Sequence, residues 1–336
     1  MTVTTYPADY SSAFGDAIFV VRGVSADADK GAQVQILSAS STTPLGTKYF
    51  FNTSLIRVNV ASYARAYLKI EPPTIAGLQT LPKRAVALRV GADGTYSASR
   101  YVALGADTLS QGVLLSDVAQ RRLSPGEVDE ITFIPPSGDV WIHITATDSK
   151  RKSYTWRTLP CVASGGMVSY VADFDSMALQ AQSEGGLVPE EIVKFKAEVL
   201  FGALTAFTVT YEVVPNPQGV RLAWVNRYGA VDCYTFPVES KNRIRVQRHT
   251  ENTARGSEIT EGNAWWEQTL SAGLCNRNEA ECLATIATAP NVWRWSGGKW
   301  EPCIVLSTDV TTHNCDEPCA VNITLRGADN LNTQTL

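Results

Sequence analysis

The sequence predicts a mainly β protein, built from two β-sandwich or barrel-like domains with one or two short helices. Short apolar runs rich in β-branched residues recur along almost the whole chain. In Val140–Ala146 apolar and polar residues alternate, which places Val140, Ile142 and Ile144 on one face, as in a half-buried strand. Clusters of Gly, Pro, Asn, Asp and Ser separate these runs, as expected for turns between strands.

Strands are expected wherever such a run lies between two turn clusters. In the first half of the chain the runs are Ala17–Val24, Gln33–Leu37, Lys48–Phe51, Leu55–Val60, Ala85–Val90, Ile131–Ile134 and Val140–Ala146. In the second half they are Ile192–Leu200, Ala206–Val214, Arg221–Val225, Val231–Val238, Arg243–His249, Cys303–Leu306 and Cys319–Arg326.

Two segments have the signals of a short helix. Ser116–Leu123 starts with a residue suited to an N-cap and stops before a Ser-Pro-Gly turn. Asn278–Thr288 has a capping candidate in Asn278, acidic residues in its first turn, and Pro290 after its end. The second is the stronger of the two predictions.

A length of 336 residues fits two domains. Polar, flexible stretches lie near Ala163–Gly166 and at Gln180–Gly186. We therefore expect an N-terminal β domain over residues 1–165 and a C-terminal β domain over residues 166–336, with the short helix near residues 279–289. No internal repeat supports a finer division.

The composition excludes several classes of protein. A chain with 44% apolar and 18% charged residues is globular and not disordered. A net charge of −4 gives no general basic field for holding nucleic acid. No apolar run is long enough for a transmembrane helix and no signal peptide is recognised, so we expect no membrane partner and synthesis in a cytoplasm.

The histidines and other reactive residues do not form a known catalytic motif. The histidines are His143, His249 and His313, and no nucleophile elbow, phosphate-binding loop or zinc-protease motif is present. We therefore expect no enzyme activity, no catalytic residues, no cofactor and no metal. The state of the seven cysteines stays open between free thiols, disulfides and a metal clip that includes His313 and Cys315.

Residues 220–236 are the most informative segment and read VRLAWVNRYGAVDCYTF. The pattern alone predicts a core hairpin with a turn at Asn226–Gly229. The string also resembles a motif of the form W-[LMV]-N-R-x-G-G-x-[DE]-x-Y-T-F from tail and virion structural proteins of Bacteroidetes phages and prophages. Ala230 stands where the motif has its second glycine. The opening segment Pro7–Val20 and the order of elements over Glu279–Leu306 are similar in character.

This resemblance implies a virion structural protein, such as a distal-tail, baseplate or tail-associated ring component. Such a protein would assemble symmetrically with copies of itself and with other virion proteins, inside the cytoplasm of a bacterial host. It has no catalytic site, and we expect its interface residues to include those of the motif. These are Trp224, Asn226, Arg227, Tyr228, Gly229 and Tyr234.

A basic strand and a group of tryptophans are further candidates for contacts. In a strand, Arg243 and Arg245 point the same way as Lys241, which fits a solvated face, an acidic subunit interface, or DNA in a ring lumen. Trp293 and Trp295 share a face near Trp300. They fit a core hairpin, a subunit interface, or a platform for a host glycan.

The sequence therefore leaves three functions open. The first is the virion structural protein. The second is a glycan-binding or receptor-binding module, placed at a tail tip or in a β-sandwich carbohydrate-binding protein. The third is a glycan-degrading enzyme, whose only supports are the acidic pairs Asp173 with Asp175 and Glu190 with Glu191.

Overall fold

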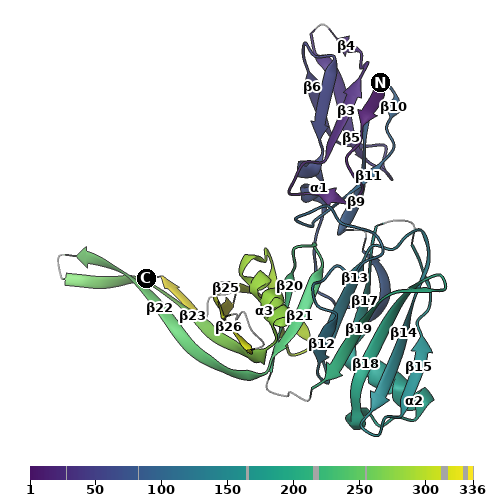
Figure 1. Ribbon diagram of the computed structural model, residues 1–336. Helices are drawn as coiled ribbons and strands as arrows, with labels where there is room; N and C mark the ends of the chain where they lie inside the picture. Colours follow the sequence, from purple (N-terminus) through teal and green to yellow (C-terminus); the bar gives the residue numbers. More distant parts are fainter. Residues whose placement is uncertain are drawn as a thin grey trace.

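The computed structural model describes residues 1–27, 29–81, 83–163, 166–214, 219–253, 256–311, 317–327 and 332–335. As predicted, the protein is mainly β (Figure 1). Its described strands form five sheets, which group into an N-terminal lobe, a middle lobe and a C-terminal lobe. None of the described helices is long and apolar enough to cross a membrane.

The N-terminal lobe packs two sheets against each other. The smaller sheet has the order β1 (Thr2–Thr5), β3 (Ile18–Arg22) and β7 (Leu55–Asn59). The larger has the order β2 (Ser11–Ser12), β11 (Arg100–Ala103), β9 (Ala85–Ala92), β5 (Gly31–Ser38) and β4 (Ala26–Asp27), with β6 (Pro44–Phe50) on β5 and β10 (Thr95–Tyr96) on β9. Phe19, Ile36 and Leu88 fill the core between the sheets, and α1 (Ala61–Tyr67) adds Ala61 and Ala64 to it.

The middle lobe is a second sandwich with its own core. One sheet has the order β13 (Val128–Phe133), β17 (Met167–Asp173) and β8 (Gly77–Leu81). The other has the order β12 (Gln120–Leu123), β19 (Leu204–Val213), β18 (Ile192–Phe201), β14 (Gly138–Asp148) and β15 (Ser153–Arg157), with β16 (Cys161–Ala163) on β14. Because β14 pairs with both β16 and β18, hydrogen-bonded strands lie on both sides of the boundary predicted at residue 165.

The C-terminal lobe is one large antiparallel sheet. Its order is β21 (Val231–Phe236), β20 (Val220–Val225), β24 (Val292–Ser296), β25 (Lys299–Thr311), β26 (Cys319–Gly327), β23 (Gly256–Cys275) and β22 (Val238–Thr253), with β27 (Asn332–Thr335) on β23. Helix α3 (Arg277–Ala284) and the 3-10 turn η2 (Thr285–Thr288) cover one face and contribute Leu283 and Ile286 to the core.

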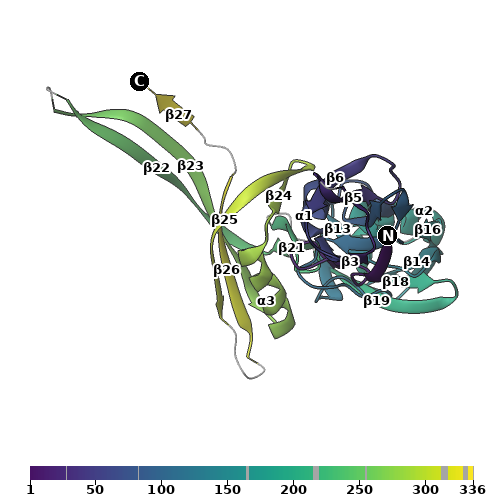
Figure 2. The same cartoon turned by 90° about the horizontal axis from the view of Figure 1, so that it is seen from above.

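Strands β22 and β23 continue far beyond the last pair with β26, Glu267 with Arg326, as a ribbon that β27 joins over Glu261–Ala264. Both views show this ribbon projecting away from the three lobes (Figures 1 and 2). The pairing runs from Lys241 opposite Thr269 to Thr253 opposite Gly256. We call the projecting part, residues 241–253 and 256–268, the arm.

Most of the predicted strands are confirmed, but the helix predicted at Ser116–Leu123 is wrong. Residues Gln120–Leu123 instead form β12, which pairs in parallel with β19. The side chain of Arg121 is buried there and finds charged partners that a surface helix would not offer. Tertiary contacts therefore override a weak local helix signal.

The helix predicted at Asn278–Thr288 is confirmed as α3 followed by η2, with a different cap. Asn276, and not Asn278, caps the helix, because its side chain accepts a hydrogen bond from the backbone N–H of Glu279 at 2.9 Å. The Glu279 carboxylate in turn accepts from the Asn276 N–H at 3.1 Å, which completes a capping box.

Replacing Asn276 with alanine should lower the free energy of unfolding by about 1 kcal/mol, because the backbone N–H of Glu279 at the helix start loses its acceptor. Urea denaturation monitored by circular dichroism measures this. Asn278→Ala is the matched control and should change stability by less than about 0.5 kcal/mol, since Asn278 is exposed inside the helix. A larger effect at Asn278 would contradict the cap assignment.

Among the described elements, helices α1 and α2 and the 3-10 turn η1 lie outside the sequence prediction. Helix α2 (Phe174–Gly185) follows β17 directly, and the Asp173 side chain caps it by accepting from the Ser176 N–H at 2.7 Å. Gly186 ends α2 in the left-handed conformation with φ +60. The short 3-10 turn η1 (Pro189–Glu191) then leads into β18.

Candidate functional site

The hairpin of β20 and β21 carries the motif singled out in the sequence, and Asn226 organises its turn. The Asn226 side-chain oxygen accepts hydrogen bonds from the backbone N–H groups of Tyr228 at 2.9 Å and Ala230 at 3.1 Å. Its amide nitrogen donates to the Leu115 carbonyl at 2.9 Å and to the Asp232 carboxylate at 2.8 Å. Asn226 therefore fixes the turn and also ties it to the start of the middle lobe.

The tip of this turn packs closely against the segment that links the N-terminal and middle lobes. Gly229 has φ +71, and a Cβ atom built on it would lie 2.7 Å from the backbone carbon of Leu104. A glycine is therefore required both by the backbone angle and by the space. Beside it, the Arg227 guanidinium and the Tyr228 hydroxyl both contact Asp117, at 2.6 and 2.7 Å.

The apolar residues of the motif belong to the core of the C-terminal lobe. Trp224 is only 1% exposed, and its indole N–H donates to the Thr285 hydroxyl at 3.0 Å. Tyr234 packs edge-on against Phe236 in the same cluster. The core-hairpin reading of the pattern is therefore confirmed for these residues, which touch other parts of the same chain.

A network of buried ion pairs lies where this hairpin meets the middle lobe, and we call it the ionic junction. Asp129 on β13 is fully buried between two guanidinium groups, with Arg121 at 2.7 Å and Arg221 at 3.2 Å. Arg121 also reaches Asp232 on β21 at 3.2 Å, and Arg221 reaches Glu127 at 3.1 Å. Since Arg121 comes from β12 and Arg221 from β20, the junction joins two lobes.

A further pair extends the ionic junction to the N-terminal lobe. Arg84, directly before β9, forms a bidentate ion pair with Glu130 on β13, and both side chains are buried. The second guanidinium nitrogen of Arg84 also donates to the Glu71 carbonyl at 3.0 Å. All three lobes are therefore held by charged contacts that water does not screen.

Burial and ion pairing shift the pKa of the Asp232 carboxyl in opposite directions. Burial raises the pKa of its carboxyl, and the Arg121 guanidinium with hydrogen bonds from Ser116 and Asn226 only partly offsets that rise. The Coulombic attraction of Asp129 and Asp232 raises the pKa of Arg121 in spite of its burial. Buried charges of this kind are costly to leave unpaired.

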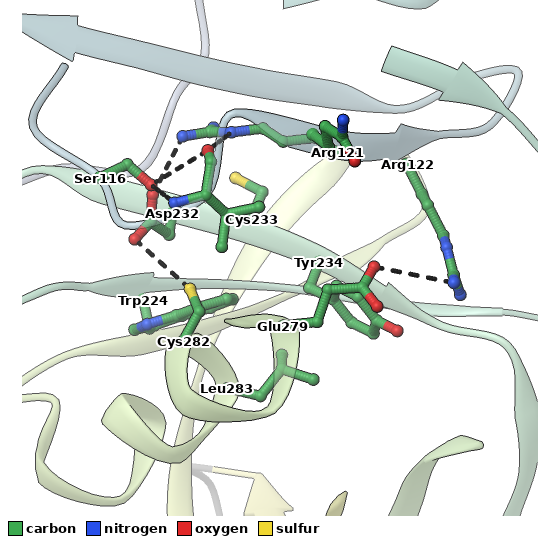
Figure 3. A pocket seen from close by; sticks show the side chains of 12 residues that line it. Ser116, Arg121, Arg122, Trp224, Asp232, Cys233, Tyr234, Glu279, Cys282 and Leu283 are labelled. Atoms are coloured by element: carbon green, nitrogen blue, oxygen red, sulfur yellow. Dashed lines mark hydrogen bonds and ion pairs between the residues drawn. The ribbon is translucent and has the colours of Figure 1, made fainter. Parts of the chain in front are cut away.

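A narrow pocket opens beside the ionic junction, between β12, β21 and α3 (Figure 3). Its lining includes Arg122 and Glu279, which face each other at 3.7 Å, and the Cys282 thiol, 3.9 Å from the Asp232 carboxylate. Desolvation raises the pKa of Cys282, and the negative charge of Asp232 adds to this rise. The thiol is therefore held protonated, which is the opposite of what a nucleophilic cysteine requires.

Burial also raises the thiol pKa of Cys161, Cys233, Cys275 and Cys303. Cys161, Cys233, Cys275, Cys282, Cys303 and Cys319 are free thiols in the structure. Burial raises the pKa of Cys303 to about 12 and raises that of Cys233 well above its ordinary value. Cys315 and His313, which the sequence suggested for a metal clip, lie outside the described residues.

Native labelling with iodoacetamide at pH 8 should leave Cys233 and Cys282 unmodified over the time in which a free model thiol reacts completely. Burial blocks access, and the raised pKa of each thiol lowers its thiolate fraction. Peptide mass spectrometry of native and urea-unfolded protein measures this, with full labelling expected after unfolding. Rapid native labelling at Cys282 would contradict a structural role for this thiol.

The tryptophans proposed for glycan or interface contacts lie on the β24–β25 hairpin. Trp293 is buried against Ala223 and Val225, and Trp295 packs edge-on against Trp300 with ring centroids 4.9 Å apart. The Trp300 indole N–H donates to the Pro73 carbonyl at 2.7 Å. This hairpin thus contacts residues near the N-terminal lobe, and two of its indoles are engaged within the chain.

The basic strand lies on the arm. Arg243 and Arg245 are exposed on β22, and Arg245 pairs with Glu267 on β23 at 2.9 Å. Between them Ile244 is 54% exposed, and its cross-strand partner Trp266 is 48% exposed. The structure thus separates the predicted interface residues. The motif residues Trp224, Asn226 and Tyr234 are buried, Arg227 is exposed beside Asp117, and Arg243 and Arg245 are exposed on the arm.

The acidic pairs considered for a glycosidase have structural partners. Asp173 caps α2, Asp175 accepts from the Gly126 N–H at 3.1 Å, and Glu191 forms an ion pair with Lys150 at 2.8 Å. Glu190 is exposed. Across the described ranges, no group of three or more His, Cys, Asp and Glu side chains could hold a metal ion.

Sequence reasoning missed the ionic junction. A signal was present, because the acidic residues Glu127, Asp129 and Glu130 lie just before the apolar run Ile131–Ile134. Acidic residues next to a buried strand imply buried partners of opposite charge. Their identity could not be inferred, since Arg221 lies about 90 residues further along the chain.

We compared the chain with known families and proteins. No family model matches it, and no curated protein matches its sequence.

Proposed function

We propose that this chain is a structural protein of a phage virion, a tail component that works by assembly with copies of itself and with neighbouring virion proteins. One observation carries the proposal, which is the arm projecting from a body whose lobes are joined by buried ion pairs (Figure 1). Such a body keeps its shape while the arm reaches away from it.

The surface of the arm supports a role in protein contacts. Ile244 and Val246 are each 54% exposed, and Trp266, which lies opposite Ile244, is 48% exposed. Where β27 does not pair with β23, the arm is only two strands wide, and a two-stranded ribbon is marginally stable on its own in water. An apolar stripe on such a ribbon is favourable only when another surface covers it.

The free edge of the arm supports the same role. Over Lys241–Arg248 the described strand β22 pairs with β23 alone, so its outer edge faces solvent. Basic side chains along that edge oppose uncontrolled pairing with a second β22 edge, because like charges would meet. An acidic partner surface would be accepted, which makes the contact selective.

The position in a virion tail rests on the resemblance of residues 224–236 to tail and virion structural proteins. Within the chain, these residues hold the hairpin turn in place and contact the segment between the N-terminal and middle lobes. Subunits of a symmetric ring need a rigid body, since a small change in lobe angle would prevent closure.

Negative-stain microscopy of the purified untagged chain, with mass spectrometry of phage particles that encode it, tests this function. We expect rings or another discrete oligomer, and peptides of the chain in purified particles. A protein that stays monomeric and is missing from particles would contradict the proposal. Binding of a host polysaccharide by that monomer would instead favour the glycan-binding alternative.

A further inference from the structure

Two buried cysteines lie directly opposite each other in the sheet of the C-terminal lobe. Cys275 is the last residue of β23 and Cys319 is the first residue of β26, and the antiparallel register makes them cross-strand partners. Both side chains belong to the core cluster of this lobe, so they leave the sheet on the same face. The Cys275 thiol donates a hydrogen bond to the Cys319 backbone carbonyl at 3.4 Å, which places its sulfur beside the partner strand.

The backbone spacing of this pair suits a disulfide bond. The Cα atoms of directly opposed residues in an antiparallel sheet lie about 4.5–5.5 Å apart, within the range of about 4.4–6.8 Å that a disulfide requires. The bond can therefore form without a shift of either strand. In the described strands no other cysteine has a cysteine as its register partner, because the partners of Cys161, Cys233 and Cys303 are valine, alanine or glycine residues.

We propose that Cys275 and Cys319 form a cross-strand disulfide when the folded protein meets a small-molecule disulfide oxidant such as glutathione disulfide. The inference does not depend on the proposed assembly function. The thiolate of one cysteine attacks a sulfur of the oxidant and displaces one glutathione thiolate, which leaves a mixed disulfide on the protein. The thiolate of the second cysteine then attacks the protein sulfur of that mixed disulfide and releases the second glutathione. The two cysteines lose two protons and two electrons in total, and the oxidant gains them as two glutathione thiols.

The position of both thiols at strand ends gives an oxidant a route to them. Cys275 is 3% exposed and Cys319 is 1% exposed, so the reaction requires a local opening. Glu317 and Pro318, directly before Cys319, are exposed, and the ends of elements open at a lower free energy than their centres. Burial also raises the pKa of the Cys275 thiol and lowers its thiolate fraction. We therefore expect the native protein to be oxidised, at a lower rate than an exposed dithiol.

The bond would fasten the start of helix α3 to strand β26. Cys275 directly precedes Asn276, the residue that caps α3. The two cysteines are 44 positions apart, and the loop that the bond closes contains α3, η2, β24 and β25. Closing a loop of this length restricts the unfolded chain and so stabilises the folded lobe. Oxidation is therefore expected to raise the stability of the C-terminal lobe.

Peptide mapping of the full chain after native treatment with glutathione disulfide tests the inference. Remaining thiols are alkylated in urea, and the protein is digested with trypsin and Asp-N without reduction. Cleavage before Asp309 and Asp316 places the last three cysteines on different peptides. We expect a peptide that contains Cys275 linked to the one that contains Cys319. The melting temperature of the oxidised protein should exceed that of the reduced protein by at least about 3 °C.

Cysteine variants provide the controls, each compared in its oxidised and reduced forms. Cys319→Ser should lose the link and the rise in melting temperature, and Cys275→Ala, which adds no polar group to the core, should give the same result if Cys319→Ser does not fold. Cys161→Ser is the matched control and should keep both effects, because the register partner of Cys161 is Val140. Recovery of Cys275 and Cys319 as thiols or glutathione adducts, or linked only to other cysteines, would overturn the inference and leave the assembly function standing.

Discussion

Replacing Asp129 with alanine should lower the free energy of unfolding by about 3–5 kcal/mol, because it leaves two buried guanidinium groups without their shared carboxylate. Arg121 and Arg221 both pair with Asp129, and all three side chains are at least nine-tenths buried. Equilibrium urea denaturation measures the loss. We also expect the variant to lose contact between the middle and C-terminal lobes, which limited proteolysis detects.

An exposed ion pair provides the control for this prediction. Glu281→Ala removes the partner of Arg277 on the surface of α3, where the pair lies 2.7 Å apart in an i,i+4 arrangement. Its loss should change the free energy of unfolding by at most about 0.5 kcal/mol. If Asp129→Ala were as mild as Glu281→Ala, the ionic junction would not hold the lobes together.

Replacing Trp224 with alanine should also cost about 3–5 kcal/mol, because it leaves a large cavity in the core of the C-terminal lobe. Trp224 is 1% exposed, packs within the core cluster of that lobe, and donates to the Thr285 hydroxyl at 3.0 Å. Trp224→Phe should cost less, since it keeps an aromatic ring and loses only part of the volume and the hydrogen bond.

Trp266 is the matched control for Trp224. It is 48% exposed on the arm, so Trp266→Ala should change the free energy of unfolding by less than about 0.5 kcal/mol. We therefore expect Trp224→Ala to lower the stability of the chain, and Trp266→Ala to weaken its assembly without lowering its stability. A larger stability loss at Trp266 would mean that the arm packs onto the body of its own chain.

The strands could be predicted wherever one face of a run is buried. In β14 the alternation of Val140, Ile142 and Ile144 reflects a core on one side and solvent on the other. The hairpin of β20 and β21 was likewise evident from its turn residues. Both features depend on residues that are close together in the sequence, so they can be recognised from one sequence alone.

Features that depend on distant residues could not be predicted. The helix expected at Ser116–Leu123 gave way to β12 because β19 and the ionic junction take up that segment. Helix α2 was missed because the sequence predicts a polar, flexible stretch at Gln180–Gly186, although Phe174, Met177 and Ala181 face the core. The arm was recognised only in part, as Arg243–His249, where Ile244 and Val246 alternate with polar and charged residues.

The residues predicted at interfaces were also recognised correctly only in part. Arg243 and Arg245 could be recognised from their alternation with Ile244 and Val246, and the structure places them on the exposed arm. The motif residues Trp224 and Asn226 were expected at an interface, and the structure gives them contacts inside the chain. Only the fold distinguishes the two cases, because burial depends on the other lobes.

The most direct test of assembly through the arm is mass photometry of the wild-type chain beside the double variant Ile244→Ser with Val246→Ser. We expect a discrete oligomer of several copies for the wild type and a folded monomer, with an unchanged melting temperature, for the variant. Identical mass distributions for the two proteins would contradict the claim that the arm joins one copy to the next.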